Sequence, residues 1–271
     1  MQITNPNKII FPKSKIKKID VVKYYADVAK LMLPFVEKRL LSVIRCHTNI
    51  NEQCFFKKHP TTEVEFENSI TIDGEEYFFV AKDYELVYQV QLGTLEFHTW
   101  GASAEKPNKP DIMVLDLDPD EKMPLKHLQQ AVEKVRCFLD ELNLKSFLKT
   151  SGGKGYHIVI PFLSSKNYDK FYEFSKNIAL VLEQKYPKIF TTNIKKNKRK
   201  NKIFIDYLRN NKGSTCVAPY SIRARENAPI SMPISWDNLY NISPNEITIK
   251  NYKKYLSEAW KDFFKVNQKI N

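Results

Sequence analysis

The chain has 271 residues, which is enough for one large domain or two smaller ones with a sizeable core. Its 42% hydrophobic residues describe a folded protein, and its net charge of +12 favours a polyanionic partner, either nucleic acid or an anionic membrane. No apolar run reaches the ~18 residues of a membrane span, and no basic amphipathic helix dominates. Nucleic acid is therefore the better partner, and no membrane partner is expected.

The four cysteines (Cys46, Cys54, Cys137 and Cys216) lie far apart and form no Cys-x-x-Cys pair. This spacing argues against a zinc site and against a disulfide framework. A reduced cytoplasm is the simplest location for such a chain. Met1 is not followed by a signal-peptide pattern, which agrees with that location.

The N-terminal part predicts an arm followed by alternating helices and strands. Residues 5–18 are polar and lysine-rich and predict an extended arm, and the helix expected after them is disturbed by Pro34. The next expected elements are a strand at 40–46, a strand at 77–80, a helix at 83–92 and a strand at 94–99. Residues 106–110 are bracketed by prolines and are the best candidate for a linker between two lobes, 1–105 and 111–271.

The C-terminal part continues the alternation. Its expected elements are a strand at 112–118, a helix at 125–142, strands at 146–150 and 156–161, a helix at 166–184, a strand at 203–207 and a lysine-rich helix near 249–264. Strands and helices alternate, so the fold class is α/β or α+β. The basic run 195–202 fits contact with a nucleic-acid backbone and a solvated hairpin equally well.

Residues 112–120 join an apolar run to two carboxylates one residue apart. In a strand, Asp116 and Asp118 project from the same face, about 6–7 Å apart along the backbone. Such carboxylates repel each other, and a Mg²⁺ or Mn²⁺ ion between them removes the repulsion. The alternative is a strand that runs into an Asp-rich turn at Pro119.

A glycine-rich turn, Ser-Gly-Gly-Lys-Gly-Tyr-His at 151–157, separates two of the predicted strands. Its backbone amides suit an anion-binding nest, to which Ser151, Lys154 and His157 add side-chain donors for a triphosphate. The alternative is a tight glycine hairpin with polar surface residues.

Asp206 lies in the apolar strand 203–207, where burying a bare charge is costly. An edge position facing water or a salt bridge would explain it without any ligand. With Asp116 and Asp118 nearby, it becomes a candidate third metal ligand. Three carboxylates, two divalent ions and a triphosphate cradle define phosphoryl transfer.

These three motifs appear in the order of the archaeo-eukaryotic primase motifs, and the chain resembles the polymerase (primase-like) domain of bacterial ligase D and its stand-alone relatives, which act in non-homologous end joining. The likeness runs nearly end to end and includes Asn5-Pro6-Asn7-Lys8, Phe55-Phe56-Lys57-Lys58, Leu95-Glu96-Phe97-His98 and Ala218-Pro219-Tyr220-Ser221-Ile222-Arg223. It implies a single primase-polymerase catalytic unit over 1–271, of α/β (α+β) class, with two lobes and an RRM-like catalytic sheet.

The resemblance assigns catalytic and metal-binding roles to the carboxylates. Asp116 and Asp118 would bind two Mn²⁺ (or Mg²⁺) ions, and Asp206 would bind the ion at the primer 3′-hydroxyl. The side chains implied to bind the incoming NTP or dNTP are His98, Ser151, Lys154, His157 and Arg223.

The resemblance also implies two sets of DNA contacts. The residues of a 5′-phosphate pocket would be Asn5, Lys8 and Lys18, and those on the template would be Arg45, Phe55, Phe56 and Lys58. Adjacent aromatics followed by lysines suit base stacking, with a pair of core rings as the alternative. The alternative for the N-terminal lysines is a solvated face.

The expected function is a metal-dependent, template-directed nucleotidyltransferase. As a DNA-repair polymerase it would extend or gap-fill 5′-phosphorylated DNA ends and prefer ribonucleotides. Its expected partners are DNA, nucleoside triphosphates, Ku and a separate or fused ATP-dependent DNA ligase, in the cytoplasm at the nucleoid. The alternatives are a primer-independent primase and, from another class, a non-catalytic DNA-end-binding module.

Two features depart from the family pattern. Arg209 stands three residues after Asp206, where many relatives have glutamine, and this leaves nucleotide or template contact at that position open. The chain also has no Lys-x-Asp-Gly ligase signature. We therefore expect nick sealing to need a separate ligase or a longer protein.

Overall fold

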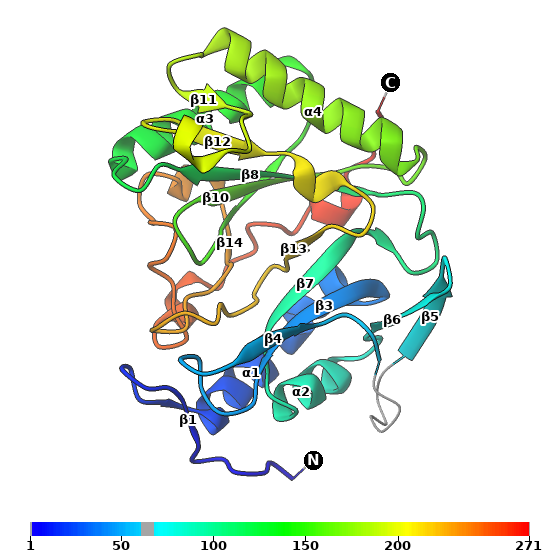
Figure 1. The fold of residues 1–271 in the computed structure, drawn as a ribbon, viewed down its shortest axis with the longest axis vertical. Coiled ribbons are helices and arrows are strands. Elements are labelled where there is room, and N and C mark those ends of the chain that lie inside the picture. Colours follow the sequence, from blue (N-terminus) through cyan, green and yellow to red (C-terminus); the bar gives the residue numbers. More distant parts are fainter. Residues whose placement is uncertain (1, 61–67, 271) are drawn as a thin grey trace. The chain divides into compact units, whose positions relative to one another are not determined.

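The chain folds into two units, each assembled from discontinuous stretches (Figure 1). The computed structural model describes residues 2–60 and 68–270. The first unit comprises Met1–Pro107, Thr215–Met232 and Ile247–Tyr255, and the second comprises Asn108–Ser214, Pro233–Glu246 and Leu256–Asn271. The break after Pro107 falls inside the expected linker, but the chain returns to the first unit twice. The second lobe, expected as the continuous stretch 111–271, is therefore interrupted.

The second unit is built on a six-stranded sheet with strand order β11-β12-β8-β10-β9-β14. Its elements are β8 (Ile112–Pro119), α3 (Leu125–Glu141), β9 (Phe147–Thr150), β10 (Tyr156–Pro161), α4 (Tyr168–Lys185), β11 (Phe190–Thr191), β12 (Ile203–Asp206) and β14 (Pro233–Ile234). From β8 to β12 the main elements follow a βαββαβ order, with β8 and β10 in the centre of the sheet. Figure 1 shows α3 and α4 on the same side of this sheet, which is the expected RRM-like arrangement.

Alternation along β8 gives the sheet one apolar face and one charged face. Met113, Leu115 and Leu117 are completely buried and form the apolar face on which the helices pack. Burial of each such side chain stabilises the folded state by about 1.5–3 kcal/mol. The next residues along the strand point the other way, so Asp116 and Asp118 lie on the face opposite the helices.

The first unit contains a four-stranded sheet with order β13-β7-β3-β4 and two short strand pairs, β1-β2 and β5-β6. Its elements are β1 (Ile9–Phe11), β2 (Ile16–Lys17), α1 (Lys18–Val36), β3 (Arg39–Cys46), β4 (Cys54–Lys57), β5 (Asn68–Ile72), β6 (Glu75–Phe79), α2 (Asp83–Gln91), β7 (Thr94–Ser103) and β13 (Thr215–Val217). Buried Tyr25 of α1 fixes the helix to the sheet, because its hydroxyl donates to the Leu95 carbonyl at 2.5 Å. The arm expected at 5–18 thus carries two short strands.

The expectation of unlinked cysteines is wrong for one pair. Cys46 and Cys54 form a disulfide, with their Cα atoms 4.3 Å apart. They lie directly opposite each other on the antiparallel strands β3 and β4, which brings together residues that are eight positions apart in the sequence. The link therefore joins the two strands of a hairpin.

The lysine-rich helix expected near 249–264 is also wrong. That stretch contains two short 3-10 turns, η4 (Tyr252–Tyr255) and η5 (Phe263–Lys265). In the first unit the Tyr252 hydroxyl donates to Asp27 at 2.5 Å, and in the second unit Trp260 Nε1 donates to the Leu148 carbonyl at 2.9 Å. These tertiary contacts override the helical pattern. Among the described residues, no helix is both long and apolar enough to cross a membrane.

Candidate active site

A row of polar residues crosses the centre of the second unit's sheet. Strand register places Lys149 of β9 opposite His157 of β10, His157 opposite Asp116 of β8, and Asp116 opposite Asp206 of β12. Residues directly opposite one another share a face of the sheet, so these four side chains lie together on the face opposite the helices. Asp118 is two residues further along β8 and joins them on that face. The structure thus brings the three predicted carboxylates together.

His157 links the row through both of its ring nitrogens. Its Nε2 lies 3.3 Å from Asp116 Oδ1, and its Nδ1 lies 2.7 Å from Lys149 Nζ. His157 and Lys149 are both buried. Sequence reasoning missed Lys149, although a lysine in the apolar strand predicted at 146–150 was a signal that could have found it.

Arg209 lies against two of the carboxylates. Its Nε is 3.2 Å from Asp206 Oδ2 and 3.9 Å from Asp116 Oδ2. Arg209 is placed by the short turn η2 (Leu208–Asn210), whose Asn210 side chain accepts from the Val114 amide and donates to the Val114 carbonyl. The residue that departs from the family pattern therefore sits in the carboxylate cluster.

The three carboxylates differ in how well their charges are compensated. Burial alone would raise the pKa of Asp116, but His157, Arg209 and Lys149 lower it to about 2. Removal from solvent and repulsion by Asp116 raise the pKa of Asp118. Burial and Asp116 also raise the pKa of Asp206, against the lowering effect of Arg209. Two of the three acids therefore resist ionisation and would gain from an added cation.

The donor set fits a hard divalent ion. Carboxylate oxygens are the preferred ligands of Mg²⁺ and suit Mn²⁺ as well. Within the part of the chain that the structure describes, no three His, Cys, Asp or Glu side chains are already arranged to hold a metal. Here the guanidinium of Arg209 lies at the carboxylates. Asp116, Asp118 and Asp206 are the residues that would hold such an ion, with the Arg209 guanidinium beside them.

The glycine-rich turn at 151–157 differs from the expected amide nest. The amides of Gly153 and Gly155 donate to the Ser151 hydroxyl oxygen, at 3.0 and 3.3 Å, and the Gly152 amide donates to the Pro244 carbonyl at 3.0 Å. The expectation of outward-facing amides is wrong for these three groups, because the turn uses them to hold its own shape. Among the predicted donors of the turn, exposed Lys154 reaches outward, and its ammonium lies 2.9 Å from Glu121 Oε1.

Gly155 is required where the turn packs on β8. A Cβ atom at this position would lie 2.0 Å from the Leu117 carbonyl oxygen, which is a severe clash with backbone. The turn can therefore approach β8 this closely only with glycine at this position. This contact fixes the turn next to the two residues that flank Leu117, Asp116 and Asp118.

The other two predicted nucleotide ligands lie in the first unit, around Glu96. His98 Nε2 and Arg223 Nε each lie 2.8 Å from Glu96 Oε2, and the Ala224 amide donates to Glu96 Oε1 at 2.7 Å. Burial alone would raise the pKa of Glu96, but these partners lower it to about 2. Sequence reasoning missed Glu96, which holds both predicted ligands in place.

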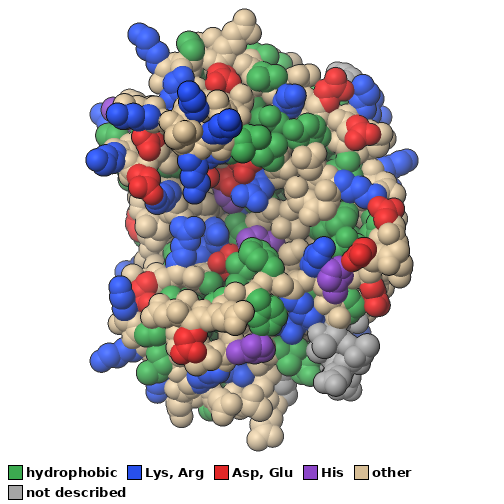
Figure 2. Space-filling view, viewed as in Figure 1, with side chains coloured by type: hydrophobic (Ala, Val, Ile, Leu, Met, Phe, Trp, Pro, Cys, Tyr) green, Lys and Arg blue, Asp and Glu red, His purple; other side chains and the backbone are tan. Residues whose placement is uncertain are grey.

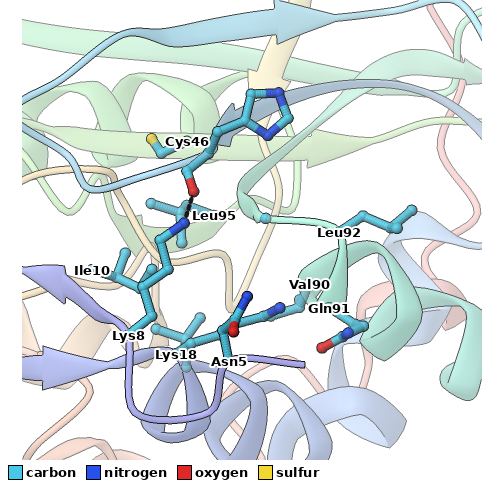
Figure 3. Close-up of a pocket in the computed structure, with 12 residues that line it drawn as sticks. Asn5, Lys8, Ile10, Lys18, Cys46, Val90, Gln91, Leu92 and Leu95 are labelled. Atoms are coloured by element: carbon cyan, nitrogen blue, oxygen red, sulfur yellow. Dashed lines mark hydrogen bonds between the residues drawn. The ribbon is translucent and has the colours of Figure 1, made fainter. Parts of the chain in front are cut away.

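The residues predicted to bind a 5′-phosphate line one pocket of the first unit, of about 190 Å³ (Figure 3). Asn5, Lys8 and Lys18 come from the N-terminal segment, and Lys8 Nζ donates to the His47 carbonyl. Partial burial and the nearby charge of Lys8 lower the pKa of Lys18. A pocket in which two cations repel each other suits an anion. Sequence reasoning missed His47, which also lines this pocket.

The four predicted template residues have different surroundings. Phe56 is 68% exposed and Phe55 is 36% exposed, which is against the alternative of a buried core pair. Lys58 is exposed just beyond β4. Arg45, in contrast, is buried, and it donates to Gln89 at 2.6 Å and to Thr94 at 3.2 Å. Contact of these residues with a template stays a prediction.

The basic surface is distributed. Figure 2 shows lysine and arginine side chains spread over the face in view, with acidic side chains and patches of hydrophobic side chains among them. Such a surface favours nucleic acid through many weak contacts with phosphates.

An RRM-like sheet that gathers three carboxylates on one face is the arrangement that the resemblance to primase-polymerase domains predicts. A family model described as "LigD, primase-polymerase domain" matches residues 17–264. That match covers most of the chain, and the chain therefore belongs to the LigD primase-polymerase domain family. The family resemblance inferred from the sequence is confirmed.

Named relatives agree with the family model. The chain is 34% identical over 283 residues to the multifunctional non-homologous end joining protein LigD of Pseudomonas aeruginosa, covering 100% of the chain and 34% of that protein. It is 31% identical over 253 residues to the bifunctional non-homologous end joining protein LigD of Bacillus subtilis, covering 92% of the chain and 41% of that protein. The chain thus spans well under half the length of these relatives.

A solved structure confirms the fold. The polymerase domain from Mycobacterium tuberculosis ligase D, in complex with DNA, matches with a TM-score of 0.85 and 26% sequence identity. The match covers 92% of each chain. The expected primase-polymerase fold is therefore present in this chain.

Proposed function

We propose that this chain is a metal-dependent, template-directed nucleotidyltransferase that extends or fills in DNA ends during non-homologous end joining. One observation carries the proposal. Strand register gathers Asp116, Asp118 and Asp206 on one face of the sheet, and Asp118 and Asp206 have raised pKa values that an added cation would relieve. The end-joining names of the relatives and the DNA-bound relative support the choice of substrate.

Asp116 and Asp118 would hold two divalent ions, and Asp206 would hold the one at the primer 3′-hydroxyl. When bound, such ions ease deprotonation of the attacking hydroxyl and neutralise the leaving pyrophosphate. The chain itself contributes the rigid sheet that holds the three acids in register. We infer that Mn²⁺ is the preferred ion, in keeping with the family resemblance.

The glycine-rich turn at 151–157 would contribute side chains that bind the triphosphate. In the second unit, Lys154 would exchange its ion pair with exposed Glu121 for a phosphate, which costs little because surface pairs are weak. Ser151 would keep the turn in shape through its bonds to Gly153 and Gly155. Lys154 would therefore contact the phosphate, and Ser151 would hold the turn that carries Lys154.

The remaining nucleotide ligands would act from the Glu96 cluster. Glu96 orients the His98 ring and the Arg223 guanidinium, so both would be preset before a nucleotide arrives. His157, whose Nε2 faces Asp116, would complete the set in the second unit. We further propose that ribonucleotides are preferred over deoxynucleotides.

DNA would be recognised at its end and along its template. Lys8, Lys18 and Asn5 would take a 5′-phosphate in the pocket that they line. Exposed Phe55 and Phe56 would stack on template bases, and each stacked base is worth ~1–3 kcal/mol. Ku and an ATP-dependent ligase, separate or fused, would be the partners, with the DNA in the cytoplasm.

Primer extension on a short gapped duplex with a downstream 5′-phosphate tests the proposal. Each nucleotide set, NTPs or dNTPs, would be supplied with Mn²⁺ or Mg²⁺, with Asp116→Ala alongside. We expect templated addition by the wild type and a loss of at least a thousandfold in the variant. No addition under any condition, with DNA binding intact, would replace the proposal with a non-catalytic end-binding module.

A further inference from the structure

Lys149 is a buried charge to which the proposed function gives no task. Its side chain is 1% exposed, in the middle of β9, and its ammonium lies 2.7 Å from His157 Nδ1. Burying an ammonium group is costly unless it is well hydrogen-bonded, so its place beside an imidazole calls for an explanation. The ladder register that puts Lys149 opposite His157 fixes this contact through the backbone.

The chemistry of the three groups fixes where the ring proton of His157 lies. A lysine ammonium can only donate, so His157 Nδ1 must accept and carry no proton. The ring proton is then on Nε2, which lies 3.3 Å from Asp116 Oδ1. An ionised carboxylate can only accept. Lys149, His157 and Asp116 therefore form a one-way series of donors and acceptors across the sheet.

This series leaves the two oxygens of Asp116 with different tasks. Oδ1 accepts from His157, whereas Oδ2 is the oxygen nearest to the Arg209 guanidinium, at 3.9 Å. One oxygen is thus held by the sheet, and the other faces a cation. Partners that orient a metal-ligating side chain in this way usually change metal affinity by about 10–100-fold when they are removed.

We propose that Lys149 is a positioning residue that fixes the His157 ring, with its proton on Nε2, and that through His157 it would hold Asp116 ready to bind a divalent ion. This inference rests on the proposed function in one respect, because it takes Asp116 to be a metal ligand. A lysine that merely filled space would affect the stability of the sheet and leave the affinity of Asp116 for a divalent ion unchanged.

Nitrogen NMR of the histidine rings tests the proposal without any activity. The chain has five histidines, so long-range ¹H–¹⁵N spectra are simple, and a His157→Gln sample assigns the signals of interest. In the metal-free wild type at pH 7, we expect an unprotonated Nδ1 and a protonated Nε2 on His157. A protonated Nδ1 would overturn the proposal, and this reading needs no variant of Lys149.

A second test replaces Lys149 with methionine. The matched control is Lys145→Met, because Lys145 is an exposed lysine just before β9. The Lys149 variant should bind Mn²⁺ at least about tenfold more weakly, measured by electron paramagnetic resonance. The Lys145 variant should match the wild type. A folded Lys149 variant with unchanged Mn²⁺ affinity would contradict the proposal.

The two readings also separate this inference from the proposed function. Weaker Mn²⁺ binding by the Lys149 variant, in a protein that adds no nucleotide, would remove the polymerase proposal and keep Lys149 as a positioning residue. Templated addition by a protein whose His157 carries a proton on Nδ1 would keep the polymerase proposal and remove the role of Lys149.

Discussion

Two groups of acids in this chain are alike in sequence and different in structure. Glu96 lies in a strand of the first unit with three donors around it, and its pKa is lowered to about 2. Asp118 and Asp206 lie on strands of the second unit, and their pKa values are raised by burial and by Asp116. Each acid sits among hydrophobic residues in the sequence.

The difference separates two uses of a strand carboxylate. An acid whose charge is fully compensated by its own protein stabilises the fold and has no need of an ion. Acids that repel each other and keep raised pKa values destabilise the metal-free protein. A bound cation would remove this repulsion and stabilise the ionised acids. Glu96 is of the first kind, and Asp118 and Asp206 are of the second, beside Asp116, whose own pKa is lowered to about 2.

The largest expected effect on stability comes from Glu96→Gln. A pKa moved from 4.5 to about 2 corresponds to on the order of 3 kcal/mol of folding free energy at neutral pH. Because the folded-state pKa is the lower one, this stability is fully present above pH 4.5 and is lost as the pH falls towards 2. Urea unfolding at pH 7 and at pH 3 would measure a deficit that shrinks in acid.

Glu105→Gln is the matched control for Glu96. Glu105 is exposed and pairs with Lys38 at 2.6 Å. Surface pairs of this kind contribute little, so its replacement should leave stability unchanged at both pH values. Equal losses in the two variants would show that Glu96 is not the anchor described here.

A smaller effect, on DNA-end binding, is expected at the 5′-phosphate pocket of the first unit, which Lys8 and Lys18 line. Lys8→Ala and Lys18→Ala should each reduce the preference for 5′-phosphorylated over 5′-hydroxyl ends by about tenfold, the worth of one charged hydrogen bond. Competition binding with the two kinds of duplex measures this ratio. Lys30→Ala, on the exposed side of α1, should keep the wild-type preference; an unchanged ratio in both pocket variants would remove the phosphate assignment.

The smallest effect is expected from Arg209→Gln. The guanidinium pairs with Asp206 and lies near Asp116, so it would compete with a metal ion, and it is about half exposed. Its removal should tighten Mn²⁺ binding by about threefold, since a partly exposed ion pair is worth less than 1 kcal/mol. Arg136→Gln, on α3, is the control. Weaker Mn²⁺ binding by the Arg209 variant would mean that the arginine supports the site.

Local pattern was enough to predict the carboxylate pair and most of the main elements. The period-two alternation of β8 places Asp116 and Asp118 on one face whatever the rest of the chain does. The glycine-rich turn could also be predicted, because its glycines and its lysine are evident in the sequence itself. Its hydrogen bonding was not, since whether the Gly153 amide faces outward or donates to Ser151 depends on the closed shape of the turn.

Strand pairing decided what the sequence could not show. Lys149 becomes a partner of His157 only because β9 lies beside β10, and Cys46 meets Cys54 only because β3 and β4 form a hairpin. Register of this kind is set by the whole sheet and not by a short window of residues. The helix expected near 249–264 was wrong for a similar reason, because distant contacts outweighed its own periodicity.

Direct Mn²⁺ titration tests the central claim. This claim is that Asp118 and Asp206, the acids with raised pKa values in the second unit, form an ion site and that Glu96 of the first unit does not. Free Mn²⁺ would be followed by electron paramagnetic resonance for the wild type, Asp118→Asn and Glu96→Gln. We predict Mn²⁺ binding by the wild type, at least tenfold weaker binding by Asp118→Asn, and unchanged binding by Glu96→Gln. Binding that survives in Asp118→Asn or fails in Glu96→Gln would contradict the account.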